Sequence, residues 1–195
     1  MFRTLGVYLL LVIPLSLQPP PSPQDVPAPS AYSVDEARKV LRAIDQIRAE
    51  SPQPWTGPLR EVAITESELN SYIAYRIEHE REEIMKVLKL KLFAGNRVEG
   101  VARVDLRGQK VPSFIKPEMD IFFAADLAVS NQAVRISLKK LFVGNEPIQP
   151  YILDVIIAIS AALQKTEATS LGDWYELPYG IKNVEFLKGM ALIYY

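Results

Sequence analysis

The sequence contains no cysteine and only one histidine, His79, among its 195 residues. The absence of cysteine excludes a disulfide scaffold, a lipid-modified N-terminal cysteine and a thiol nucleophile. The nine glycines fall singly, so no glycine-rich phosphate or dinucleotide loop is present, and no G-x-S-x-G nucleophile elbow occurs. We therefore expect that the protein is not an enzyme and that it carries no cofactor, no catalytic residue and no metal ligand.

Two patterns that could carry chemistry are weak. Residues 79–83, HEREE, resemble a zinc-protease helix motif in which Glu83 replaces the second histidine. Such sites need two histidines one helical turn apart, so a solvated, charged helix end is the favoured interpretation. Asp120 and Asp126 share one face of a predicted strand, but about 20 Å of strand separates them, beyond the roughly 5–10 Å of glycosidase carboxylate pairs.

The balance of charge excludes one further class of function. The formal net charge is −1 at pH 7, so the chain has no broad positive field with which to hold nucleic acid. The same neutrality argues against a strong attraction to anionic membrane surfaces. We expect no nucleic-acid partner.

The N-terminus predicts export. In residues 1–17, Arg3 precedes about a dozen apolar residues, the proportions of a secretory signal peptide. Pro14 interrupts this stretch, and a spanning helix would need roughly 20 apolar residues. Residues 18–32 form a proline-rich linker. We expect an extracytoplasmic protein, periplasmic or secreted, and leave open whether an uncleaved leader tethers it to the membrane.

The folded part is expected to be a single α+β domain over residues 33–195. Apolar residues recur at helical spacing over 33–51, after a capping box in which Ser33 precedes Glu36 by three positions. A short strand over 60–64 leads into a second helix, which Thr65 and Glu68 cap in the same way. This second helix buries the stripe Leu69, Ile73 and Ile77, and its pattern predicts that Glu66, Asn70 and Arg76 face water.

From about residue 84 the apolar period changes from 3.6 to 2. Four long strands follow, joined by short polar turns such as Gly95–Asn96, and they form an antiparallel meander with one apolar face. Gly100 indicates a bulge or a bend, and the run LKKLF at 138–142 shifts the register as a bulge would.

The last third of the chain predicts a third helix and a hairpin. Residues 151–164 are apolar nearly all round, so other parts of the fold must enclose that helix. Its Asp154 either faces a polar edge or pairs with a cation, or else serves as a polar handle inside a ligand cavity. A final hairpin turns at Lys188–Gly189. The expected fold class is α+β: a long curved antiparallel β-meander wrapped around an apolar helix, with an additional N-terminal amphipathic helix.

This layout resembles the bacterial half-tube lipid-binding proteins, the LmeA-type and YceB-type relatives of the tubular lipid-binding (TULIP) superfamily. The resemblance covers about residues 60–195, and two segments carry most of it: T-x-S-E-L-N at Thr65–Asn70 and the closing segment from Leu177–Pro178 to Gly189. The helix over 33–51 has no place in that pattern. The resemblance implies a strongly bent sheet around a helix, with an apolar groove for acyl chains.

The preferred hypothesis is an exported protein that binds a lipid or another apolar small molecule and acts by sequestration or transfer at the cell envelope. The expected walls of its groove are Leu69, Ile73, Ile77, Phe123, Ile152, Ile156, Ile159 and Leu163. The alternative is a non-enzymatic envelope module with a fully packed core, which binds another protein through an exposed sheet edge or its N-terminal helix. Ligand identity and oligomeric state stay open.

Overall fold

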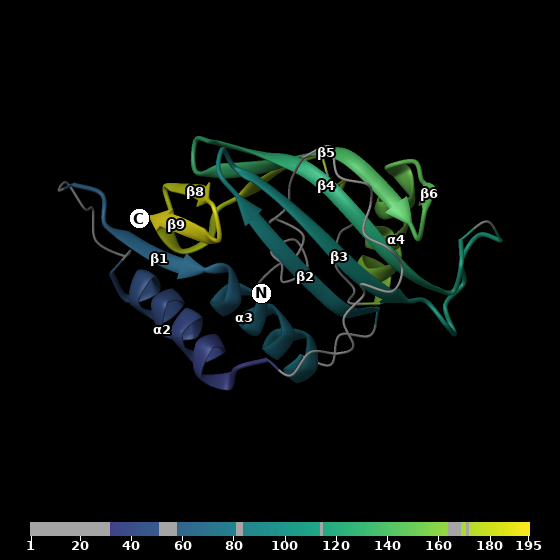
Figure 1. The fold of residues 1–195 in the computed structure, drawn as a ribbon, viewed down its shortest axis with the longest axis horizontal. Coiled ribbons are helices and arrows are strands. Elements are labelled where there is room, and N and C mark those ends of the chain that lie inside the picture. The colour runs from purple at the N-terminus through teal and green to yellow at the C-terminus, as the bar shows by residue number, and fades with distance from the viewer. Residues whose placement is uncertain (1–31, 51–57, 81–83, 114, 164–168, 171) are drawn as a thin grey trace.

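The computed structural model describes residues 32–50, 58–80, 84–113, 115–163, 169–170 and 172–195 (Figure 1). Within these residues the chain forms an α+β fold with three α-helices, a six-stranded antiparallel sheet and a three-stranded antiparallel sheet, neither of them closed. The leader and nearly all of the proline-rich linker lie outside the described residues. None of the described helices is long and apolar enough to cross a membrane.

The six-stranded sheet contains the four predicted long strands. They are β2 (Met85–Phe93), β3 (Arg97–Asp105), β4 (Glu118–Ser130) and β5 (Ala133–Val143), which lie in this order, and the short strands β6 (Glu146–Pro147) and β7 (Trp174–Glu176) both pair with β5. The predicted bulge in β5 is confirmed. Ala124 opposes Lys140 and Ala125 opposes Leu138, so Lys139 is the extra residue.

Two glycines of this sheet behave differently. Gly95 and Asn96 form the predicted turn between β2 and β3, with φ angles of 80° and 55°. The prediction of a bulge at Gly100 is wrong, because the register of β3 against β4 runs through this position without a shift, and the alternative of a bend stays a prediction. Gly100 lies opposite Phe123, and a Cβ there would come within 2.6 Å of the phenyl ring. This glycine therefore makes room for an aromatic side chain.

The three-stranded sheet joins the two ends of the folded part. Its order is β1 (Glu61–Thr65), β9 (Met190–Tyr194) and β8 (Asn183–Leu187), all antiparallel. The predicted C-terminal hairpin is therefore confirmed, with its turn at Lys188–Gly189. Its pairing with β1 is a contact between distant parts of the chain that no local pattern indicates.

The N-terminal helix α2 (Val34–Glu50) falls within the predicted range, but its capping box is only half formed. The Ser33 hydroxyl accepts a hydrogen bond from the Glu36 backbone N–H at 3.2 Å, as predicted. The Glu36 carboxylate does not reach back to Ser33. It accepts from the hydroxyls of Ser67 and Ser71 at 2.9 and 2.7 Å, and so it ties α2 to the next helix, α3 (Glu66–His79).

One main apolar cluster lies on the face of the six-stranded sheet that α3 and α4 (Tyr151–Leu163) share. Figure 1 shows α2 and α3 at one end of the molecule and α4 at the other end, beside β5 and β6. A second, smaller cluster, Ile47, Ile181 and Tyr195, joins α2 to the C-terminus.

Candidate functional site

The first group of predicted wall residues lies on α3. Thr65 Oγ1 accepts from the Glu68 backbone N–H at 3.2 Å, and the Glu68 carboxylate accepts from the Thr65 backbone N–H at 2.9 Å, so the predicted capping box is confirmed. Because the box sets where the helix begins, Leu69 and Ile73 turn into the main cluster, where they are 7% and 4% exposed. Ile77 packs against the same cluster and is half-buried.

The polar flank of α3 does not face water as predicted. The Asn70 side chain donates to the carbonyl of Leu90 and accepts from the N–H of Leu90, both at 2.8 Å. One turn earlier, the Glu66 carboxylate accepts from the Leu92 N–H at 2.6 Å. β2 is an edge strand of the sheet, and these two side chains bond the backbone groups that a neighbouring strand would otherwise bond.

Arg76 is also less exposed than predicted, although its partners lie on its own helix and at the end of that helix. Its side chain is 22% exposed; it donates to the Tyr72 hydroxyl at 2.6 Å and pairs with Glu80. Helical periodicity finds the apolar stripe, but it does not tell a flank that meets a strand edge from one that meets solvent. A polar pair at i and i+4 beside the stripe, as at Glu66 and Asn70, is the signal that could have indicated this contact.

Phe123 supplies the sheet's contribution to the predicted walls. It is 9% exposed, belongs to the main cluster and fills the space left by the missing side chain of Gly100. Leu90 also approaches this position, at 3.0 Å from where a Cβ would lie. Side chains from both strands that flank β3 therefore occupy the space beside Gly100.

The second group of predicted wall residues lies on α4 and is less buried than the group on α3. Ile156 is 7% exposed and belongs to the main cluster, whereas Ile152 and Ile159 are half-buried against it. Leu163 is 38% exposed and lies outside the cluster. The structure thus brings seven of the eight predicted residues to one apolar cluster and leaves Leu163 at the surface.

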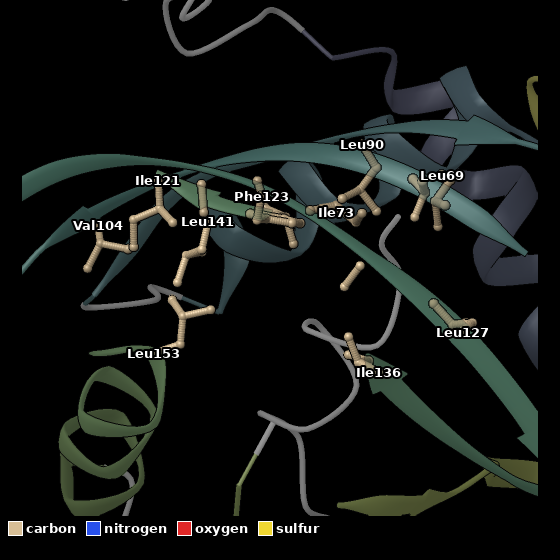
Figure 2. Packing of buried hydrophobic residues seen from close by; sticks show 14 of the residues in the cluster. Leu69, Ile73, Leu90, Val104, Ile121, Phe123, Leu127, Ile136, Leu141 and Leu153 are labelled. Carbon is tan, nitrogen blue, oxygen red and sulfur yellow. The ribbon is translucent and has the colours of Figure 1, made fainter. Parts of the chain in front are cut away.

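Figure 2 shows how the two groups face the sheet. Leu153 of α4 reaches toward Leu141 of β5, while Leu69 and Ile73 of α3 lie on the far side of Phe123. The cluster is therefore continuous from α3 to α4 along one face of the sheet.

Asp154 lies at a polar edge of α4. Its Oδ1 accepts a hydrogen bond from the Ser170 hydroxyl at 3.1 Å, and the Ser170 backbone N–H donates to Asp173 at 2.9 Å. Tyr175 donates its hydroxyl proton to the Ser170 carbonyl. Burial raises the pKa of Tyr175, and the charges of Asp173 and Asp154 act in the same direction. These contacts match the polar-edge interpretation of Asp154.

The side chains considered for catalysis have other contacts. His79 stacks on Tyr75 with ring centroids 4.0 Å apart. Asp120 forms a bidentate pair with Arg103, at 2.8 and 3.2 Å, and Asp126 pairs with Lys139 at 3.0 Å. Glu83 lies outside the described residues. Within the described ranges, no group of three His, Cys, Asp or Glu side chains could hold a metal ion.

A hollow of about 290 Å³ lies between α2 and β1, where Val40 and Ile64 at the edge of the main cluster form part of its lining. The residues that line it are Lys39, Val40, Arg42, Ala43 and Gln46 of α2, Val62, Ala63 and Ile64 of β1, and Glu68 of α3. The Thr65 backbone N–H holds the pKa of Glu68 below its ordinary value, and Lys39, 3.0 Å away, acts in the same direction, while burial opposes both. No sequence pattern indicates this hollow, because it lies between segments that no single periodicity connects.

Comparisons of this chain with protein-family models, with curated proteins and with solved structures find no match.

Proposed function

We propose that the protein binds an apolar ligand, such as a lipid acyl chain, between α4 and the apolar face of the six-stranded sheet. The observation that supports this proposal is the incomplete covering of α4. On this helix, Ile152, Val155, Ile157 and Ile159 are only half-buried, and Tyr151 and Leu163 are 51% and 38% exposed. An apolar guest along this seam would remove further apolar surface from water, at about 25 cal/mol for each Å².

The apolar surface continues from α4 onto the sheet. Leu138 and Val143 of β5 are also half-buried and pack against the main cluster. By contrast, Leu69 and Ile73 at the α3 end are almost fully covered. The ligand-facing part of the cluster is therefore the α4 end, where the half-buried Ile152 and Ile159 flank the buried Ile156, and the α3 residues act as its supporting core.

Two features of the sequence support a role in lipid sequestration or transfer at the cell envelope. The leader over residues 1–17 indicates export, and the half-tube resemblance supplies a bent sheet around the apolar helix. The protein would sequester or transfer a lipid at the cell envelope, without a catalytic residue, and an uncleaved leader would keep it near the membrane.

The experiment combines organic extraction and native mass spectrometry of the purified full chain with displacement of a fluorescent fatty acid. We expect a co-purifying apolar molecule and saturable fatty-acid binding. Ile156→Trp is expected to abolish binding with little loss of stability, because the ring occupies the guest's space. Ala158→Trp, on the exposed side of α4, is the matched control and is expected to retain binding.

A clean mass with no fatty-acid binding would reject this proposal and favour the packed envelope module. The same conclusion follows if Ile156→Trp destabilises the protein by about 1–3 kcal/mol, the cost of overfilling a packed core.

A further inference from the structure

The outer edge of β1 carries backbone groups that have no strand beside them. Arg60 and Tyr195 exchange both of their backbone hydrogen bonds at 3.0 Å, and the Glu66 N–H donates to the Gly189 carbonyl at 2.9 Å. Hydrogen bonding alternates along an antiparallel pair, so the peptide groups of Glu61, Ala63 and Thr65 point away from β9. β1 ends the three-stranded sheet, and no strand of the described residues pairs with that edge.

Only part of this edge is satisfied within the fold. The Thr65 N–H donates to the Glu68 carboxylate at 2.9 Å. The backbone N–H and carbonyl of Ala63 have no such partner among the described residues. This differs from the edge of β2, where side chains of α3 bond the strand directly.

The hollow lies beside the open edge of β1. The side chains of Val62 and Ile64 belong to the face that α2 covers, and the backbone groups of Ala63, which also lines the hollow, point to the open edge. Its opposite wall is one side of α2, at helical spacing i, i+3, i+4 and i+7 from Lys39 to Gln46. A groove between an edge strand and a helix can accept an extended peptide as an added strand.

The charge of the groove indicates the character of that peptide. Two cations and one carboxylate line the groove, and Lys39 is already paired with Glu68 at 3.0 Å. The exposed guanidinium of Arg42 has no ion pair within the described part of the chain. One positive charge is therefore left to receive an anion, and Arg binds a carboxylate through two parallel hydrogen bonds.

We propose that an extended segment of a partner protein, with an acidic side chain, adds as a strand to the outer edge of β1. Its backbone exchanges hydrogen bonds with Ala63, its carboxylate pairs with Arg42, and a small apolar side chain lies against Val40 and Ala43. This inference goes beyond the proposed lipid function, because no residue of α4 or of the six-stranded sheet lines the groove.

Several features favour a polypeptide over a lipid. The open backbone donor and acceptor of Ala63 match the repeat of a strand, and a hydrocarbon chain would leave them unsatisfied. The hollow of about 290 Å³ is just below the range of roughly 300–1,000 Å³ of small-molecule pockets, so it accepts a side chain rather than a whole lipid.

The test uses the purified full chain and a phage-displayed library of random heptapeptides. We expect selected peptides to alternate β-branched residues with at least one Asp or Glu. Binding of a synthetic selected peptide should weaken about tenfold or more in Arg42→Glu, since an ionic hydrogen-bonded pair contributes roughly that factor or more. Arg38→Glu makes the same charge change on α2, outside the groove, and should leave binding unchanged.

A second measurement tests strand addition directly. Amide exchange of Ala63, followed by NMR, should slow by about tenfold or more when the peptide binds, because its N–H becomes part of a ladder. Ala63→Pro removes this outward donor, which an edge strand tolerates, and should abolish binding while the protein stays folded.

Four outcomes would overturn the proposal. They are a library that yields no binder, an equal affinity of wild type and Arg42→Glu, bound peptide without protection of Ala63, and a groove occupied by a second copy of the chain or by peptides matching its own proline-rich linker.

Discussion

The side chain of Asn70 offers the sharpest test of how this fold protects its main sheet. Asn70→Ala removes two hydrogen bonds of 2.8 Å to the backbone of Leu90, a residue that is only 2% exposed. Each backbone group left without a partner in a buried setting costs about 1–3 kcal/mol. The higher helix propensity of alanine offsets roughly 0.5 kcal/mol of this loss of stability. Two such groups cost about 2–6 kcal/mol, so we expect a net loss of about 1.5–5.5 kcal/mol in the free energy of unfolding.

Urea denaturation of wild type and variant gives this difference directly, and amide exchange at Leu90 reports the cause. Exchange at Leu90 should rise in Asn70→Ala, because its N–H loses its acceptor. Asn70→Asp keeps an acceptor for that N–H but places a carboxylate beside the Leu90 carbonyl, so its stability should not return to that of wild type. Glu78→Ala, at an exposed position of the same helix, should change stability by less than about 0.5 kcal/mol.

The reasoning would be refuted if Asn70→Ala and Glu78→Ala were equally stable, or if Leu90 exchanged at the wild-type rate in Asn70→Ala. Either result would mean that water forms hydrogen bonds with the backbone N–H and carbonyl of Leu90 without a loss of stability. If Asn70→Ala loses stability as expected, the edge of β2 is also open to pairing with other chains. The variant should then aggregate more readily than wild type.

Two further predictions concern the core and the response to acid. Gly100→Ala should cost about 1–3 kcal/mol through overpacking against Phe123. Adding Phe123→Leu should recover part of that loss, so simple additivity in a double-mutant cycle would count against the contact. Glu68 has a folded pKa below its ordinary value of 4.5, so its stabilisation is present above that pH and is lost as the pH falls through the lowered pKa. The difference in unfolding free energy between wild type and Glu68→Gln should therefore be largest at neutral pH and shrink in acid, and a constant difference would contradict this assignment.

Local patterns predicted the features of this protein that depend on neighbouring residues. The Thr65–Glu68 box, the turn at Gly95–Asn96 and the bulge at Lys139 are examples, since each needs only a few residues of chain. The interpretation failed where a polar residue meets a distant backbone. Asn70 and Glu66 looked solvent-facing because periodicity reports where apolar residues recur and carries no information on the strand that lies beside them.

The same limit explains why neither the three-stranded sheet nor its groove was predicted. β1 pairs with β9 from the opposite end of the folded part, and α2 comes alongside β1 only in three dimensions. The bulge predicted at Gly100 was wrong for a related reason. A glycine in a strand indicates the close approach of another side chain as readily as it indicates a bulge. The residue that approaches is Phe123 of the next strand along the chain.

The edge strands β1 and β2 differ in how the helix beside each one meets its open backbone. Along β2, Asn70 and Glu66 of α3 form hydrogen bonds with the outward backbone groups of Leu90 and Leu92. This leaves no space for an added strand. On β1, the polar side chains of α2 bond elsewhere: Lys39 pairs with Glu68, and Gln46 donates to the Tyr195 hydroxyl at 3.1 Å. A helix that merely covered β1 would bond Ala63 as α3 bonds Leu90. Because a hollow separates α2 from this strand instead, the open edge fits a binding surface better than it fits a covered one.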